Sequence, residues 1–218
     1  RAAHGRTSQG TDATGERAQR RTLGGFGHDA VKRASSRTLI LGDSGNGKSF
    51  WAKGQIDALG TAKPILVWDP TAEWAGPSAD RPLRGANTFP SVDALCVALG
   101  RAALPRCVVQ IARDADADFR RFCSLAFTAG DCVCVIDEAH NFCRQGKCPV
   151  ELLDLLRMSR HRRVDLYLIG QRPFALAPDI RDQVNRTVLF RMSGAESLNW
   201  CDREREQGLG ARVANLAP

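Results

Sequence analysis

Residues 38–49 read TLILGDSGNGKS, a short apolar run followed by a glycine-rich turn that ends in lysine and serine. The turn matches the pattern G-x-x-x-x-G-K-[ST] of phosphate-binding loops at every fixed position. The apolar run predicts a strand and residues 48–59 predict a helix, so a chance glycine-rich turn is disfavoured. The candidate nucleotide-binding residues are Gly42, Asp43, Ser44, Gly45, Asn46, Gly47, Lys48 and Ser49.

The residue types in this loop indicate what it would bind. Glycine tolerates the backbone conformations that turn successive N–H groups inward toward phosphate oxygens. The start of the following helix adds its positive dipole end. Lys48 would then reach the β- and γ-phosphates, and the Ser49 hydroxyl would ligate Mg²⁺. The loop therefore predicts ATP and Mg²⁺ as cofactors.

Outside the loop, short apolar runs alternate with segments of helical spacing. The predicted strands are 38–41, 65–68, 107–111, 132–136, 164–169 and 187–190, and the predicted helices are 48–59, 92–99, 116–127 and 149–158. Strands that are apolar on both faces indicate a sheet that helices cover on both sides. We expect an α/β fold, a three-layer P-loop NTPase with a mostly parallel central sheet. Residues 70–91, rich in Pro, Gly and Arg, are interpreted as a long surface loop.

A second motif, CVCVIDE, occupies residues 132–138. A buried strand would deliver Asp137 at its carboxyl end, beside the phosphate-binding loop, where ligands bind in open α/β sheets. We expect Asp137 to hold Mg²⁺ and Glu138 to act as the general base on the attacking water. The alternative is an ordinary strand that ends in solvated acids. The tetrad DEAH at 137–140 also occurs in one class of helicases, but those enzymes need two motor domains, for which this chain is too short.

The third motif runs from Ser159 to Pro173 and joins a basic cluster to an apolar strand that ends in Gly-Gln. Gln171, at the tip of that strand, is the candidate sensor of the γ-phosphate or of the water. One arginine of the cluster, which comprises Arg157, Arg160, Arg162 and Arg163, is the candidate arginine finger toward a neighbouring subunit. The alternative for the cluster is a solvated basic end of a helix, which the helix dipole also favours.

The 218 residues carry a net charge of +7, and its distribution is uneven. Residues 1–37 hold eight Lys/Arg against three acids, whereas residues 38–218 hold 23 against 21. Residues 1–36 contain few large apolar side chains, so we interpret them as a basic leader that is disordered or non-native, with a DNA-binding arm as the alternative. The P-loop domain is expected over 37–218. The eight cysteines are expected to be free thiols that act as small core residues, with a metal site as the alternative.

Taken together, the three motifs resemble the FtsK–HerA superfamily of DNA-pumping ATPases. The GQRP ending at 170–173 and the Arg160-His161 lead-in carry most of this resemblance. The motif order is most similar to the genome-packaging ATPases of tailless, membrane-containing, tectivirus-like icosahedral viruses. The resemblance implies a homo-oligomeric ring, often a hexamer, that surrounds double-stranded DNA and binds ATP between subunits. It also suggests an arginine finger from the neighbouring subunit, which we place at Arg160. It also implies partners at a viral capsid or membrane vertex, and a location in the host cytoplasm or at the virion vertex.

Three alternatives to the packaging function stay open at this point. The assembly ATPases of filamentous phages, the family of zonula occludens toxin, also combine a P-loop with a strand that ends in Gln. A cellular or conjugative HerA–FtsK-type translocase, or a non-enzymatic nucleotide-binding module, are further possibilities. The candidate DNA-contacting loops are 70–88, with Arg81 and Arg84, and 141–149, with Arg144 and Lys147.

Overall fold

The computed structural model describes residues 35–60, 62–76, 79–111, 115–144 and 146–217. Its strands are β1 (Arg37–Leu41), β2 (Ile65–Trp68), β3 (Asn87–Phe89), β4 (Arg106–Val109), β5 (Val133–Ile136), β6 (Asp165–Gly170) and β7 (Arg186–Leu189). Its α-helices are α1 (Lys48–Ala58), α2 (Val92–Leu99), α3 (Ala115–Ala129), α4 (Val150–Arg162), α5 (Pro178–Gln183), α6 (Ala195–Glu204) and α7 (Leu209–Ala214). Two short 3-10 helices are η1 (Ala139–Asn141) and η2 (Pro173–Ala175). Within these ranges, no helix has both the length and the apolar character needed to cross a lipid bilayer.

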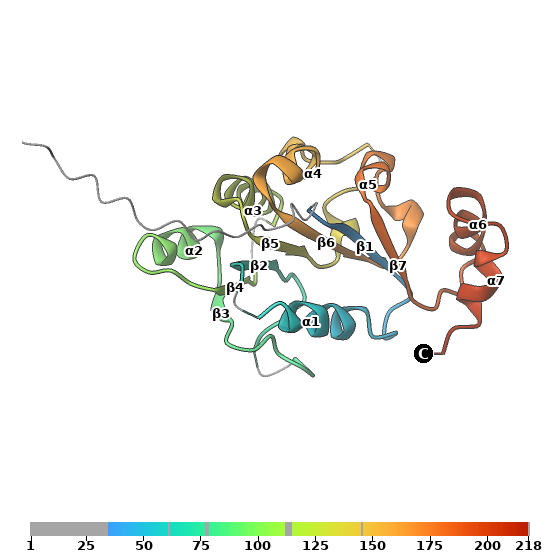
Figure 1. The fold of residues 1–218 in the computed structure, drawn as a ribbon, viewed down its shortest axis with the longest axis horizontal. Coiled ribbons are helices and arrows are strands. Elements are labelled where there is room, and N and C mark those ends of the chain that lie inside the picture. Colours follow the sequence, from blue (N-terminus) through green and yellow to red (C-terminus); the bar gives the residue numbers. More distant parts are fainter. Residues whose placement is uncertain (1–34, 61, 77–78, 112–114, 145, 218) are drawn as a thin grey trace, which may run out of the picture. The chain divides into compact units, whose positions relative to one another are not determined.

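The seven strands form one sheet in the order β3-β4-β2-β5-β6-β1-β7 (Figure 1). Every pairing between these strands is parallel, so each pair of neighbours is joined by a crossover rather than a hairpin. β6 pairs with both β1 and β5 and separates them. The predicted three-layer α/β fold with a mostly parallel sheet is confirmed, and the order of the strands decides which loops become neighbours.

Alternate residues of the central strands enter two separate cores. Cys132 and Cys134 face the core shared with α2, α3, α4 and α5, whereas Val133 and Val135 face the core shared with α1. Figure 1 shows α3, α4 and α5 on one side of the sheet and α1 on the other. The all-apolar strands in the sequence are explained by this arrangement, because both faces of the sheet are removed from water.

The ends of the helices follow local signals. Helix α1 begins at Lys48, directly after Gly47, whose φ of 77° only glycine adopts without strain. Helix α2 is capped by Ser91, whose hydroxyl oxygen accepts a hydrogen bond from the Ala94 N–H at 3.2 Å. Helix α4 ends at Arg163, which takes a left-handed conformation with φ 56° and returns the chain to the sheet. The predicted boundaries of these helices are correct to within a few residues.

The interpretation of residues 70–91 as a surface loop is wrong in part. Trp74 is fully buried and Leu83 is 3% exposed, and both belong to the core beneath α1. Residues 87–89 form the edge strand β3, paired with β4. Because proline and glycine interrupt this segment, its sequence shows neither the helical nor the strand spacing of apolar residues. Packing against α1 and the sheet gives the segment its defined path.

Two helices that the sequence analysis did not predict, α6 and α7, follow β7. Helix α6 buries Trp200 and Cys201 within the larger core, and α7 contributes Val213. Gly210 in α7 approaches α6 so closely that a Cβ would lie 2.6 Å from the Leu198 carbonyl oxygen. Trp200 is therefore a core residue of the described domain.

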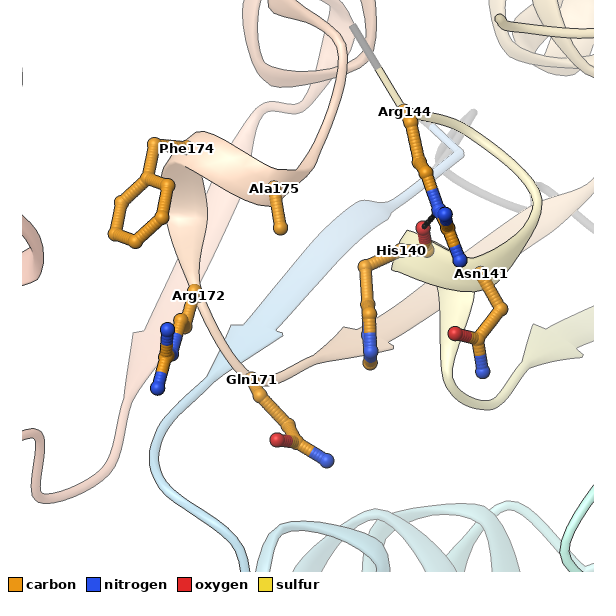
Figure 2. A pocket seen from close by; sticks show the side chains of 7 residues that line it. All are labelled: His140, Asn141, Arg144, Gln171, Arg172, Phe174 and Ala175. Atoms are coloured by element: carbon orange, nitrogen blue, oxygen red, sulfur yellow. Dashed lines mark hydrogen bonds between the residues drawn. The ribbon is translucent and has the colours of Figure 1, made fainter.

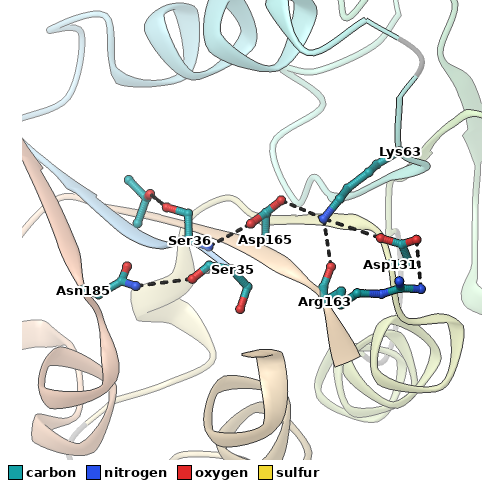
Figure 3. Close-up of polar contacts among 8 residues, drawn as sticks. Ser35, Ser36, Lys63, Asp131, Arg163, Asp165 and Asn185 are labelled. Atoms are coloured by element: carbon teal, nitrogen blue, oxygen red, sulfur yellow. Dashed lines mark hydrogen bonds and ion pairs between the residues drawn. The ribbon is translucent and has the colours of Figure 1, made fainter. Parts of the chain in front are cut away.

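At the amino edge of the sheet, a polar network joins the start of the domain to β6 (Figure 3). The Ser36 N–H donates to Asp165 Oδ1 at 2.8 Å, and Lys63 Nζ donates to Asp165 Oδ2 at 3.0 Å. The Asn185 amide also donates to the Ser35 carbonyl at 3.3 Å. Ser35 and Ser36, placed in the leader by the sequence, thus contact the domain. Residues 1–34, the rest of the predicted leader, lie outside the described residues.

Candidate active site

The three sequence motifs meet at the carboxyl edge of the parallel sheet. The phosphate-binding loop follows β1, the acid pair Asp137–Glu138 follows β5, and Gln171 follows β6. Since β6 lies between β1 and β5, Gln171 leaves the sheet between the loop and the acid pair. This is the edge at which parallel α/β sheets form their ligand-binding crevices.

The phosphate-binding loop has the shape that its glycines predict. Gly45 and Gly47 have φ values of 79° and 77°, and no atoms lie within 4 Å of a Cβ added to either. Lys48 is 7% exposed, and its Nζ donates to the Asp43 carbonyl within the loop at 2.9 Å. Burial lowers the pKa of Lys48, while Glu138 and Asp137 oppose that shift. A pocket of about 280 Å³ lies over the loop, and its lining includes Lys48, Ser49 and Glu138.

Asp137 is 2% exposed and is held by three donors. Its Oδ2 accepts from Trp74 Nε1 at 2.6 Å and from Ser49 Oγ at 3.2 Å, while its Oδ1 accepts from the Glu138 N–H at 2.9 Å. Burial raises the pKa of Asp137 to about 6, and the hydrogen bond from Trp74 opposes the shift. With that pKa the carboxylate is still mostly ionised at neutral pH, as a cation ligand requires.

Ser49 and Asp137 fit a magnesium site. Their side-chain oxygens are 3.2 Å apart and both are hard oxygen donors. No group of three or more His, Cys, Asp or Glu side chains suited to a metal occurs in the part of the chain that the structure describes. A cation bound here would need water and phosphate oxygens to complete its shell, which is how Mg²⁺ is usually held with nucleotides.

Glu138 stands at the centre of a small polar cluster. Its backbone has φ 48°, a left-handed conformation that is uncommon outside glycine. Its carboxylate accepts from Gln171 Nε2 at 3.2 Å and lies 3.1 Å from His140 Nδ1. Burial lowers the pKa of His140, so the ring is neutral at neutral pH and can donate through Nδ1. The structure therefore brings the predicted base and the predicted sensor into direct contact.

The sequence analysis missed Asp69 and Gln110, which hold the segment that carries Trp74, the donor to Asp137. Asp69, at the carboxyl end of β2, is 1% exposed and accepts from the Glu73 N–H at 3.0 Å and the Trp74 N–H at 2.9 Å. Gln110, after β4, donates to Asp69 Oδ2 at 3.0 Å. The signal was the string WDPTAEW at 68–74, an acid at a strand end like the one in the second motif.

The loop is also tied to the chain that follows β7. Asp43 Oδ2 accepts from the N–H and the hydroxyl of Ser193, at 2.9 and 2.7 Å. The Asn46 amide donates to the Arg191 carbonyl at 2.9 Å. Two of the variable positions of the loop thus have partners within the domain, and their side chains brace the loop against the segment before α6.

Arg160 does not lie at this site. It is exposed in the last turn of α4, which runs back from the carboxyl edge to the start of β6. Thirteen helical residues span roughly 20 Å, so Arg160 belongs to the opposite edge of the sheet from its own phosphate-binding loop. This position excludes a role for Arg160 in the nucleotide pocket of its own subunit. Its assignment as a finger toward a neighbouring subunit stays a prediction.

A second pocket, of about 540 Å³, is lined in part by His140 and Gln171, whose side chains also contact Glu138 (Figure 2). Its lining residues are His140, Asn141, Arg144, Gln171, Arg172, Phe174 and Ala175. The lining has two arginines and no carboxylate, and Phe174 is 37% exposed. Of the candidate DNA-contacting residues, Arg144 lies here. Lys147 instead pairs with Asp116 at 2.7 Å, and Arg81 lies by the phosphate-binding loop.

The parallel sheet, the glycine-rich loop on β1 and the acid pair on β5 define the fold as that of a P-loop NTPase. No protein-family model matches the chain. Over 161 residues the chain is 28% identical to Protein P9 of Pseudoalteromonas phage PM2, an alignment that covers 72% of this chain and 67% of P9.

Solved structures of a viral packaging protein share the fold. The genome packaging NTPase B204 of Sulfolobus turreted icosahedral virus 2, in complex with ATP-gammaS, matches with a TM-score of 0.65 at 18% identity, over 85% of this chain and 89% of B204. A second structure is that of B204, the DNA-packaging ATPase from Sulfolobus turreted icosahedral virus. It matches with a TM-score of 0.63 at 20% identity, over 84% of this chain and 88% of that chain. The fold that the motifs predicted is thus shared with a genome packaging NTPase of a virus.

Proposed function

We propose that this protein is an ATP-hydrolysing motor that moves double-stranded DNA into a viral capsid. The observation that carries the proposal is the convergence of the phosphate-binding loop, Asp137, Glu138 and Gln171 at one edge of a sheet whose fold matches a genome packaging NTPase. The match extends over most of both chains, which favours packaging over the assembly of filamentous phages.

In the proposed mechanism, the loop N–H groups and Lys48 bind the β- and γ-phosphates of ATP. Ser49 and Asp137 would hold Mg²⁺, which supplies charge neutralisation between the β- and γ-phosphates. Glu138 accepts a proton from the water that attacks the γ-phosphorus, and the bond to the bridging oxygen breaks to release ADP and phosphate. Gln171, which contacts Glu138, orients that water.

Binding of DNA is proposed to depend on placed arginines multiplied around a ring of subunits. Residues 38–218 have nearly balanced charge, with 23 Lys/Arg against 21 acids, so the domain has no broad excess of positive charge. The pocket that contains Arg144 and Arg172 is suited to a phosphodiester, because two guanidinium groups face it without a competing carboxylate. In a ring, Arg160 would be offered to the nucleotide of the next subunit. Capsid or vertex partners and the location at the virion are part of the same proposal.

The test is ATP hydrolysis by the purified protein with and without duplex DNA. We expect DNA to raise the rate, and we expect the increase to fall as salt rises because phosphate contacts release counterions. Glu138→Gln should lower hydrolysis by about 10²-fold or more, since a general base contributes roughly 10²–10⁴-fold. Glu204→Gln, at an exposed position at the end of α6, is the matched control and should hydrolyse ATP at the wild-type rate. Full activity in Glu138→Gln would contradict the assignment of the base, and a rate indifferent to DNA would contradict the motor.

A further inference from the structure

Trp74 is a buried side chain to which the proposed steps of nucleotide hydrolysis assign no role. It lies in the segment between β2 and β3, is fully buried, and contributes the shortest hydrogen bond to Asp137, with 2.6 Å between Nε1 and Oδ2. The indole is a donor with no acceptor, so it can bind the carboxylate but cannot compete for a cation.

Trp74 is held both through its backbone and by a contact from α1. Its backbone N–H donates to Asp69, which is itself anchored by Gln110. Lys53 of α1, 4% exposed, lies with Nζ 5.5 Å from the centre of the Trp74 ring and donates to the Glu73 carbonyl beside it. A network of buried polar groups therefore runs from β4 through β2 to the Asp137 carboxylate on β5.

We propose that Trp74 is a positioning residue for the magnesium site, which holds the Asp137 carboxylate in the orientation that the cation needs. This inference rests on the proposed function, because it concerns the same nucleotide site. Trp74 and Ser49 both contact Oδ2, so the indole fixes the rotation of the carboxylate and Ser49 shares the same oxygen. Groups that orient a metal ligand through a hydrogen bond typically contribute 10–100-fold to metal affinity or activity.

The decisive variant is Trp74→Phe, which keeps an aromatic ring and removes the donor. Trp68→Phe is the matched control. Trp68 is also fully buried, but its Nε1 has no hydrogen-bond partner among the described residues, and it packs against Phe119, Phe122 and Phe142. Both substitutions remove similar volume from a core, so a general loss of packing affects both.

The affinity for a non-hydrolysable ATP analogue is measured once with Mg²⁺ and once with a chelator. The ratio of the two affinities is the tightening that Mg²⁺ produces, and it is compared between the wild type and each variant. We expect this tightening to fall about tenfold or more in Trp74→Phe. The affinity in chelator should stay within about twofold, since Trp74 donates its hydrogen bonds to Asp69 and Asp137 and not to the phosphate-binding loop. Trp68→Phe should retain the wild-type tightening.

Thermal unfolding shows whether each variant is folded. If Trp74→Phe does not fold, Trp74→Met decides instead, because it also removes the indole donor and its flexible apolar side chain can fill the space in this core. Wild-type tightening in the folded variant that is tested overturns the inference. A wild-type protein whose nucleotide affinity does not respond to Mg²⁺ would instead contradict the proposed function.

Discussion

At Gly42 the first residue of the phosphate-binding loop touches the segment after β7. A Cβ at this position would lie 2.5 Å from Phe190 Cβ and 3.3 Å from the Phe190 backbone. Glycine is therefore required here by close packing, whereas Gly47 is required by its backbone angle. The same sequence pattern thus uses glycine for two different physical reasons.

Gly42→Ala should lower the free energy of unfolding by about 1–3 kcal/mol, the usual cost of forcing a methyl group into packed structure. Gly100→Ala is the control, because Gly100 has an ordinary helical φ of −68° and a Cβ there would meet its nearest neighbour at 3.5 Å. We expect that control to change stability by less than about 0.5 kcal/mol. Equal unfolding midpoints in denaturant for both variants would show that the Phe190 contact is unimportant.

At the scale of elements, α4 links the acid pair to the strand that carries Gln171. It packs against α3 and buries Leu152, Leu155 and Leu156 in the larger core. Its opposite face carries exposed side chains, Met158 among them. The helix therefore anchors the connection between β5 and β6, which pair directly with each other in the sheet.

Leu155→Ala should destabilise the domain by about 2–5 kcal/mol, because Leu155 is fully buried and the cavity cannot close completely. Met158→Ala in the same helix, at a position 41% exposed, should cost less than about 0.5 kcal/mol. Chemical denaturation followed by circular dichroism measures both. A small effect of Leu155→Ala would mean that α4 is not an integral part of the core.

At the scale of the whole molecule, the net charge of +7 is a poor guide to nucleic-acid binding. Much of it lies in residues 1–37, with eight Lys/Arg against three acids, and the domain is close to balanced. A motor built on this domain would bind DNA through few arginines per subunit. The geometry singles out Arg144 and Arg172, whose pocket is also lined by Gln171 and His140, the two side chains that contact the predicted base Glu138.

The double variant Arg144→Ala, Arg172→Ala should bind duplex DNA more weakly and with a smaller salt dependence. The slope of log affinity against log salt is negative, and each lost phosphate contact makes it shallower by about 0.9. Hydrolysis of ATP without DNA should be unchanged. Arg101→Ala, an exposed arginine after α2 and so near the amino edge of the sheet, is the control. An unaltered slope in the double variant would place the DNA contacts elsewhere.

The sequence alone determined the class of the fold and the chemistry of its main site. Apolar runs of strand length and the spacing in 42–49 are local signals, so every described strand except β3, the helices α1 to α4, the loop and the acid pair could be predicted. The tertiary structure alone decided that Gln171 contacts Glu138, that Trp74 holds Asp137, and that Arg160 lies at the far edge of the sheet. These facts depend on the order of strands and on packing between distant segments, and neither has a local signal in the chain.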